Sequence, residues 1–286
     1  MHRYSYYKTA ACTLNVSIGD PQANKEEILK CIQELDSDTQ LVVFPELCIT
    51  GYTCQDLFYE HTLLNSAKQV LFEIVEELPE NLVTVLGLPL EIGNKLYNCA
   101  AICFNHDILG IQVKTYIPSY NEFYETRWFS SASELKENTT FTYKDKKVPV
   151  SNHIVFKDTT TSACLGIEIC EDLWVTIPVS STHALAGANV LCNLSASNEI
   201  ISKANYRRNL VKDQSAKCYA GYVYASAGPT ESSSDLVFSG HNLICENGTI
   251  LSETKTDKTI YGQIDLDHLN HDRLHYKTSM QDLFHV

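Results

Sequence analysis

The stretch SACLGIEICEDLWV, residues 162–175, combines the pattern of a buried strand with a reactive side chain at its end. Its apolar run from Ala163 to Ile169 stops at Cys170, and two acids follow at once. Negative neighbours disfavour ionisation of a thiol, because they destabilise the thiolate. A nucleophilic role for Cys170 therefore requires a cation from another part of the chain.

Outward from this stretch, apolar strand-like runs alternate with helical patterns, and this alternation favours an α/β fold. Turns at residues 93–95 and 247–248 predict two hairpins, and no linker rich in Gly, Pro or Ser divides the chain, which predicts a single domain. Residues 115–151 lack clear periodicity and are predicted to form a long, functional or mobile loop. The predicted strands cover residues 8–16, 41–47, 82–92, 96–105, 108–114, 160–170, 189–197, 222–228 and the hairpin 236–251, and the predicted helices cover 22–35, 64–78, 181–188 and 201–220.

The composition argues against several classes of protein. With 22 basic and 35 acidic residues, the net charge is −13, which argues against nucleic acid or an anionic membrane as the main partner. There is no signal-peptide core and no run long enough to span a membrane, so a cytoplasmic location is expected. The eleven cysteines are then expected to be free thiols. No metal site is predicted, because no CxxC pair occurs and the histidines of DHLNHDRLH (267–275) are assigned to a solvated helix face.

Three polar residues share one kind of position in the predicted sheet. Glu46, Lys114 and Cys170 each lie at the C-terminal end of an apolar strand, beside a loop. Open α/β sheets bind ligands in the crevice at these strand ends. Neighbouring strands would bring the three side chains together, and Lys114 would supply the cation that Cys170 requires.

This set of residues matches the needs of nucleophilic catalysis on a carbonyl compound. Lys114 would favour the thiolate of Cys170 and stabilise the oxyanion that forms on attack. Glu46 would accept the thiol proton, pass it to the departing amine and then activate water against the thioester. The backbone N–H of Glu171 would also donate to the oxyanion. Taken singly, the three side chains have structural alternatives: a helix cap, the end of an edge strand and a buried thiol.

Longer motifs around these residues carry a resemblance to a known family. VVFPELCITGY (42–52), VKTYIPSYNEFYETRWF (113–129) and LGIEICEDLW (165–174) resemble the Glu, Lys and Cys motifs of the nitrilase, or carbon–nitrogen hydrolase, superfamily. PELCITGYTCQDLF, NLSASNEIISKANYRR and SGHNLICENGTIL are similar to the glutaminase domain of glutamine-dependent NAD synthetases, and the resemblance runs from about Lys8 to Leu266. It implies a four-layer αββα sandwich. It also implies that Cys170 attacks the side-chain amide of L-glutamine, forms a glutamyl thioester and releases ammonia.

The resemblance also assigns roles by position. Glu46 matches the general base, Lys114 the catalytic lysine and Cys170 the nucleophile. Glu125 resembles a second glutamate that the superfamily places near the lysine, where it would hold Lys114 in position and keep it charged. Lys203 would face the α-carboxylate of the substrate, although a position on a helix surface is the ordinary explanation for a lysine. Core packing accounts equally well for two other matched positions, Tyr52 and Trp174. The matched positions in or beside the glutamine pocket are Tyr52, Tyr120, Glu171, Trp174, Ser197 and Lys203.

A domain organisation and a set of partners follow from the same resemblance. Residues 1–270 match the glutaminase (amidotransferase) domain, and residues 271–286 would begin a linker or form a C-terminal tail. The family's synthetase domain, which adenylates nicotinic acid adenine dinucleotide with ATP, has a Gly-rich phosphate loop that this sequence lacks. No cofactor is expected for the glutaminase step, with ATP and magnesium acting only on that synthetase domain.

The expected partners are L-glutamine, a synthetase domain in the full-length chain or as a separate subunit, and further copies of the chain in a homo-oligomer. Two alternatives stay open. The first is a carbon–nitrogen hydrolase acting on another ω-amide or a carbamoyl substrate. The second is a non-catalytic module that binds or regulates a partner synthetase.

Overall fold

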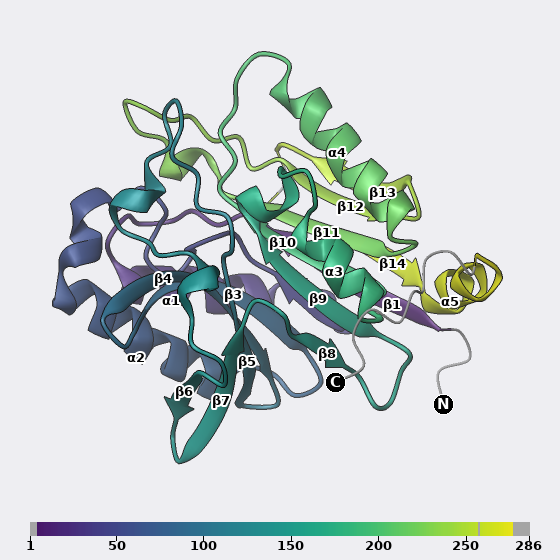
Figure 1. Ribbon diagram of the computed structural model, residues 1–286, viewed down its shortest axis with the longest axis horizontal. Helices are drawn as coiled ribbons and strands as arrows, with labels where there is room; N and C mark the ends of the chain where they lie inside the picture. The colour runs from purple at the N-terminus through teal and green to yellow at the C-terminus, as the bar shows by residue number, and fades with distance from the viewer. Residues whose placement is uncertain (1–4, 257, 277–286) are drawn as a thin grey trace.

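Two β-sheets lie face to face at the centre of the computed structural model, which describes residues 5–256 and 258–276 (Figure 1). The larger sheet has the strand order β14-β1-β2-β3-β4-β5-β7-β6 and the smaller one β13-β12-β11-β10-β9-β8. The strands are β1 (Tyr6–Cys12), β2 (Leu41–Val43), β3 (Val83–Ile92), β4 (Lys95–Phe104), β5 (Asp107–Val113), β6 (Thr140–Tyr143), β7 (Lys146–Ser151), β8 (Val155–Lys157), β9 (Cys164–Ile169), β10 (Val190–Ser195), β11 (Gly221–Ser226), β12 (Asn242–Glu246), β13 (Thr249–Thr254) and β14 (Thr259–Asp265).

Helices cover the outer face of each sheet. Helices α1 and α2 pack on the larger sheet, whereas α3 and α4 pack on the smaller one (Figure 1). The four layers therefore form an αββα sandwich, as the resemblance implied. The helices are α1 (Pro21–Gln33), α2 (His61–Glu77), α3 (Val179–Leu185), α4 (Lys203–Lys217) and α5 (Leu266–His275).

Alternation along the strands explains how the larger sheet joins two cores. Val42 of β2 belongs to the core beneath α1 and α2, whereas its neighbours Leu41 and Val43 belong to the core between the two sheets. Successive side chains of a strand point to opposite faces, so a continuous apolar run suits a strand that is covered on both sides. The third core, which includes Val211 of α4 and Leu191 of β10, joins the smaller sheet to its helices.

The parallel strands define the edge at which the predicted site residues lie. Strands β1, β2 and β3 are parallel in the larger sheet, and β9, β10 and β11 are parallel in the smaller one. Lys114 directly follows β5, Cys170 directly follows β9, and Glu46 comes shortly after β2. The strand-end placement predicted for these three residues is therefore present in the structure.

Some predicted elements differ from the observed ones. The predicted strand 41–47 ends at Val43, because the chain then turns away and Leu47 has a φ of 52°. The segment 115–151 is not one loop, since it contains β6 and β7. Both strands bury only alternate residues, which hides them in a polar sequence. Strand β14 was not predicted, although it pairs antiparallel with β1 along its whole length.

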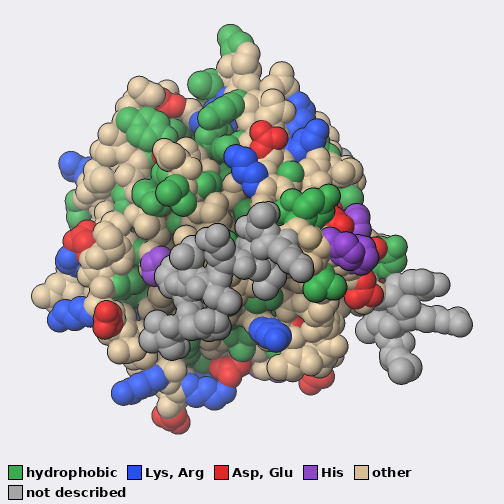
Figure 2. All heavy atoms as spheres, turned by 45° about the vertical axis from the view of Figure 1, so that its right-hand side comes forward, with side chains coloured by type: hydrophobic (Ala, Val, Ile, Leu, Met, Phe, Trp, Pro, Cys, Tyr) green, Lys and Arg blue, Asp and Glu red, His purple; other side chains and the backbone are tan. Residues whose placement is uncertain are grey.

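The surface and the helices add two observations. On the face in Figure 2, basic and acidic side chains are interspersed among the coloured residues, and Lys and Arg form no continuous patch. Within the described ranges 5–256 and 258–276, no helix combines the length and apolar character needed to cross a membrane.

Candidate active site

Lys114 is the centre of a fully buried charged cluster. Its Nζ donates to Glu46 Oε1 at 2.6 Å and to both carboxylate oxygens of Glu125 at 2.8 Å. Burial alone would favour the neutral amine, but the two carboxylates outweigh it and hold the pKa of Lys114 well above its usual value. The lysine is therefore a fixed cation.

Glu125 comes from the 3-10 helix Glu125–Arg127 and is held from its other side by a phenol. The Tyr52 hydroxyl donates to Glu125 Oε1 at 2.8 Å. Burial raises the pKa of Glu125 to about 7, while Lys114 and Tyr52 oppose that rise. The backbone of Tyr52 is itself fixed, because its N–H donates to Glu231 at 2.9 Å. Tyr52 thus supports the cluster from behind through Glu125.

Glu46 accepts hydrogen bonds on both carboxylate oxygens. Besides Lys114, Asn98 Nδ2 donates to its Oε1 at 2.7 Å, and the backbone N–H of Ala196 donates to its Oε2 at 2.9 Å. Oε2 keeps a lone pair that can take a proton from a neighbouring group. Gly87 of β3 permits this arrangement, since a Cβ there would lie 2.4 Å from the backbone nitrogen of Leu47.

Cys170 occupies a sharp turn between β9 and the short 3-10 helix Cys170–Leu173. Its φ of 44° is a left-handed conformation that is strained for a residue with a side chain. The pKa of its thiol is raised above the usual value. Burial and the charge of Glu46 cause this rise and outweigh Lys114 and the N–H of Ala196, which lower the pKa. The resting group is therefore a thiol, and Glu46 is the nearby base that can remove its proton during attack.

Asp172 fastens the turn at Cys170 to the chain that follows Lys114. Its Oδ1 accepts from the N–H groups of Thr115 and Tyr116 at 3.0 and 2.9 Å, and its Oδ2 accepts from that of Ile169 at 3.1 Å. The strand ends that carry the lysine and the cysteine thus keep a fixed separation.

A pocket of about 350 Å³ opens over Cys170. Glu171 on its wall accepts a hydrogen bond from the Tyr120 hydroxyl at 2.8 Å. The Lys203 ammonium lies 5.1 Å from the centre of the Trp174 ring and 5.5 Å from that of Phe123, within cation–π range. The pocket is lined by Pro118, Tyr120, Asn121, Glu122, Phe123, Cys170, Glu171, Trp174, Ser197, Ile200, Ile201, Ser202, Lys203 and Tyr206.

Most of the residues expected around a ligand share this pocket. Tyr120, Glu171, Trp174, Ser197 and Lys203 all line it together with Cys170. Tyr52 does not line it and instead lies behind the charged cluster, where it contacts Glu125.

Several polar residues of the site were not predicted from the sequence. Asn98 and Asp172 belong to the support of the cluster. At the pocket, the Asn198 side chain donates to Glu122 and accepts from Lys203. Asn98, Asp172 and Asn198 are common residue types. Only for Asp172, which follows the cysteine turn directly, does the sequence give a local signal.

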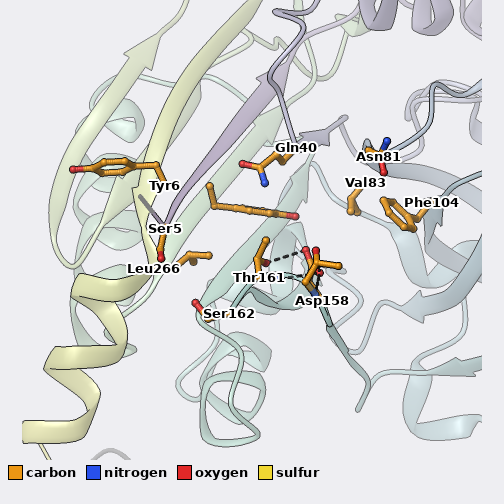
Figure 3. A pocket seen from close by; sticks show the side chains of 12 residues that line it. Ser5, Tyr6, Gln40, Asn81, Val83, Phe104, Asp158, Thr161, Ser162 and Leu266 are labelled. Atoms are coloured by element: carbon orange, nitrogen blue, oxygen red, sulfur yellow. Dashed lines mark hydrogen bonds between the residues drawn. The ribbon is translucent and has the colours of Figure 1, made fainter. Parts of the chain in front are cut away.

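A larger cavity of about 730 Å³ lies at the other end of the parallel strands (Figure 3). It is bordered by Tyr6 and Val83, the first residues of β1 and β3, and by Asp158, which accepts from Thr161. None of the predicted site residues lines it. Within the described ranges, no group of three or more His, Cys, Asp or Glu side chains is arranged to hold a metal ion.

Comparison with known proteins shows the family to which the sequence belongs. A carbon–nitrogen hydrolase family model matches residues 8–273. The glutamine-dependent NAD(+) synthetase of Mycobacterium leprae is 36% identical over 280 residues, which cover 96% of this chain and 41% of the relative. The human enzyme of the same name is 30% identical over 255 residues, covering 85% of this chain and 35% of the relative. The chain thus spans about two fifths of the length of these curated relatives.

Solved structures show the same fold. The glutamine-dependent NAD(+) synthetase from Cytophaga hutchinsonii superposes with a TM-score of 0.80 at 29% identity, over 91% of this chain and 43% of that one. Saccharomyces cerevisiae Nit3, of the nitrilase superfamily, superposes with a TM-score of 0.74 at 20% identity over 98% and 97% of the two chains. With its sequence match over most of its length and its buried Glu46, Lys114 and Cys170 at three strand ends, the chain belongs to the carbon–nitrogen hydrolase family.

Proposed function

We propose that this chain is a glutaminase that hydrolyses the side-chain amide of L-glutamine. The observation that carries the proposal is the burial of Glu46, Lys114 and Glu125 as one hydrogen-bonded cluster beside Cys170. Such a cluster supplies a base, a fixed cation and a nucleophile to one carbonyl group.

The chemistry proceeds in two halves. Glu46 takes the thiol proton while the sulfur of Cys170 attacks the amide carbon, and Lys114 with the N–H of Glu171 stabilises the oxyanion. The C–N bond breaks as Glu46 returns the proton to the nitrogen, which leaves as ammonia. Glu46 then takes a proton from water while the water oxygen attacks the thioester carbon. The C–S bond breaks, Glu46 returns the proton to the sulfur, and glutamate leaves.

The pocket above Cys170 supports an amino acid as the substrate. Lys203 lies on one wall and suits an α-carboxylate, while Glu122 and Glu171 suit an α-ammonium group. Ser197 and the Tyr120 hydroxyl add neutral polar contacts, and Trp174 adds an apolar wall. These groups match both charges of a free amino acid.

The ammonia would serve ATP-dependent synthesis of NAD from nicotinic acid adenine dinucleotide. The curated relatives are named glutamine-dependent NAD(+) synthetases. The part of them that this chain does not match is long enough for a synthetase module. ATP and magnesium would act on that module, in the same polypeptide or in a separate subunit.

We further propose a cytoplasmic homo-oligomer, in which residues 1–270 form the glutaminase domain. Helix α5 continues to His275, and residues 277–286 of the proposed tail or linker lie outside the described part.

The proposal is tested by an amide panel with the purified chain in the absence of ATP and dinucleotide. We expect glutamine to yield equimolar glutamate and ammonia, and Cys170→Ala to abolish the reaction. Lys114→Ala and Glu46→Gln should each lower kcat by roughly a hundredfold or more, as loss of one transition-state partner does. Release of ammonia by Cys170→Ala at the parent rate would refute the mechanism. Hydrolysis of a carbamoyl compound or another ω-amide in place of glutamine would refute the substrate.

A further inference from the structure

Arg207 of α4 is a fully buried cation to which the reaction gives no role. Its relative exposure is 0%, and it is among the largest fully buried side chains of the described chain. A buried charge is costly unless each of its polar atoms has a partner. The partners of Arg207 therefore indicate what its burial achieves.

The guanidinium group has five N–H bonds, and it makes five hydrogen-bond contacts. Nε and Nη2 donate to Ser197 Oγ at 3.3 and 3.1 Å, and Nη2 also donates to the carbonyl oxygen of Asn198 at 2.9 Å. Nη1 donates to Glu199 Oε2 at 3.2 Å and to His241 Nδ1 at 2.9 Å. Four of the five contacts thus hold three consecutive residues, 197–199.

The segment 197–199 follows β10 and forms part of the pocket. Ser197 lines the pocket directly. Asn198 joins Lys203 to Glu122, which lie on α4 and on the loop after β5. The side chains that would meet the charged end of an amino acid are therefore linked to one another through a segment that Arg207 holds.

The other side of Arg207 contacts His241, which directly precedes β12, and His241 in turn contacts Glu253 of β13. A guanidinium can only donate, so His241 Nδ1 is the acceptor and the proton of the neutral ring resides on Nε2. His241 Nε2 then donates to Glu253 Oε1 at 2.7 Å, and Arg208 Nε donates to the same carboxylate at 2.8 Å. The guanidinium plane is consequently held by residues 197–199 on one side and by His241 on the other.

We infer that Arg207 is a positioning residue that sets the geometry of the pocket wall recognising the α-amino and α-carboxyl groups of the substrate. This inference rests on the proposed function. It assigns to Arg207, with His241 and Glu253 behind it, control of substrate binding rather than of bond breaking. The charged cluster at Lys114 is held by other residues, namely Glu46, Glu125, Asn98 and Tyr52.

A matched control is available in Arg273 of α5. Its guanidinium also makes several hydrogen bonds, to the carbonyl oxygens of Tyr219, Gly187, Ala188 and Cys218. None of these residues lines the pocket at Cys170. Arg207→Met and Arg273→Met therefore both remove a multiply bonded arginine, but only the first removes contacts to the pocket wall.

The test measures KM and kcat for glutamine, thermal unfolding, and alkylation of Cys170 by iodoacetamide mapped by peptide mass spectrometry. Arg207→Met should raise KM by about tenfold to a hundredfold and lower kcat much less, because binding contacts are lost while the reacting groups stay in place. Alkylation of Cys170 should stay close to the parent rate. Arg273→Met should lose thermal stability and keep the parent KM.

Arg207→Lys provides a second variant in case the methionine variant does not fold. It keeps the buried charge but loses the planar fork, so KM should rise here too. An unchanged KM in a folded Arg207 variant, or an equal rise in Arg273→Met, would overturn the inference. If instead the parent chain does not hydrolyse glutamine, it is the proposed function that fails.

Discussion

Two residues of the site hold strained backbone conformations. Cys170 and Leu47, which directly follows Glu46, both have positive φ angles, of 44° and 52°. Such angles cost on the order of 1–3 kcal/mol for residues other than glycine, and they persist where the surrounding structure imposes them. Here they turn the chain sharply at Cys170 and directly after Glu46. The side chains of Cys170 and Glu46 therefore face the same crevice.

Glu125 provides a prediction at the residue scale, because its charge keeps Lys114 in place. Burial raises its pKa and the Tyr52 hydroxyl opposes that rise, so Tyr52→Phe should raise the pKa further. The proposed mechanism needs the ionised form of Glu125, which holds the Lys114 ammonium group in place. The acid limb of the kcat–pH profile should therefore move to higher pH, with a loss of roughly tenfold near neutrality for one hydrogen bond to a charged group.

A pH profile of Tyr52→Phe beside that of Tyr143→Phe checks this prediction. Tyr143 packs against Phe72 of α2, with 5.0 Å between the ring centres, in the core beneath the helices. Its profile should match the parent profile. If the acid limb of Tyr52→Phe is unshifted, Tyr52 does not tune Glu125.

The residue scale also shows what the sequence can and cannot reveal about the site. The strand-end positions of Glu46, Lys114 and Cys170 are visible in the hydrophobic pattern. The pattern does not show that burial and Glu46 outweigh Lys114 and raise the pKa of the Cys170 thiol, so that Lys114 favours the thiolate only in part. Support from Asn98 was also unpredictable, because it depends on a partner 52 residues away.

At the scale of elements, the site depends on the connection between β5 and β9. These strands belong to different sheets, and each is followed directly by a proposed catalytic residue, Lys114 after β5 and Cys170 after β9. Asp172 bridges the two ends with three hydrogen bonds from backbone N–H groups. Its carboxylate therefore replaces the strand pairing that two separate sheets lack.

The Asp172 bridge predicts a combined loss of stability and activity. Asp172→Ala leaves three N–H groups without their acceptor, that of Ile169 fully buried and those of Thr115 and Tyr116 partly so, and should lower the free energy of unfolding by about 2–4 kcal/mol. It should also reduce kcat by more than about tenfold, because misplacement of reacting groups is costly to rate. Urea denaturation and steady-state kinetics measure the two effects.

Asp158→Ala is the control for this bridge. Asp158 also accepts backbone N–H groups, from Thr160 at 2.7 Å and Thr161 at 3.2 Å, but in the loop before β9. We expect lower stability and the parent kcat. An Asp172→Ala protein with the parent kcat would show that the two strand ends are positioned by other contacts.

Helices and strands were predicted correctly where a strong local pattern dominates the sequence. They were missed where pairing with a distant strand determines the structure. The stripe of α2 and the β3–β4 hairpin follow from local residues. Strand β14 alternates buried and partly exposed residues, and its position is set by pairing with β1, about 250 residues earlier. Such distant pairing leaves little trace in a single sequence.

At the scale of the whole molecule, the sandwich brings distant segments to one pocket. Glu46 and Lys114 come from the larger sheet, whereas Cys170, Ser197 and Lys203 come from the smaller sheet and its helix. The core between the sheets is one cluster that includes Tyr7 of β1 and Leu269 of α5, and it fixes the two sheets against each other. The layer order itself was implied by the family resemblance, since strand and helix counts do not determine it.

The central claim is that Cys170 carries a glutamyl thioester during turnover, and acid-quenched mass spectrometry with isotopically labelled glutamine tests it most directly. Cys31 is the most instructive internal control, because it is partly exposed and Cys12 lowers the pKa of its thiol. We predict an adduct with the mass of glutamine less ammonia on the peptide that contains Cys170, absent from Cys170→Ala and from the peptide of Cys31. Formation of labelled glutamate with no adduct on Cys170, or with the adduct on another cysteine, would contradict this account.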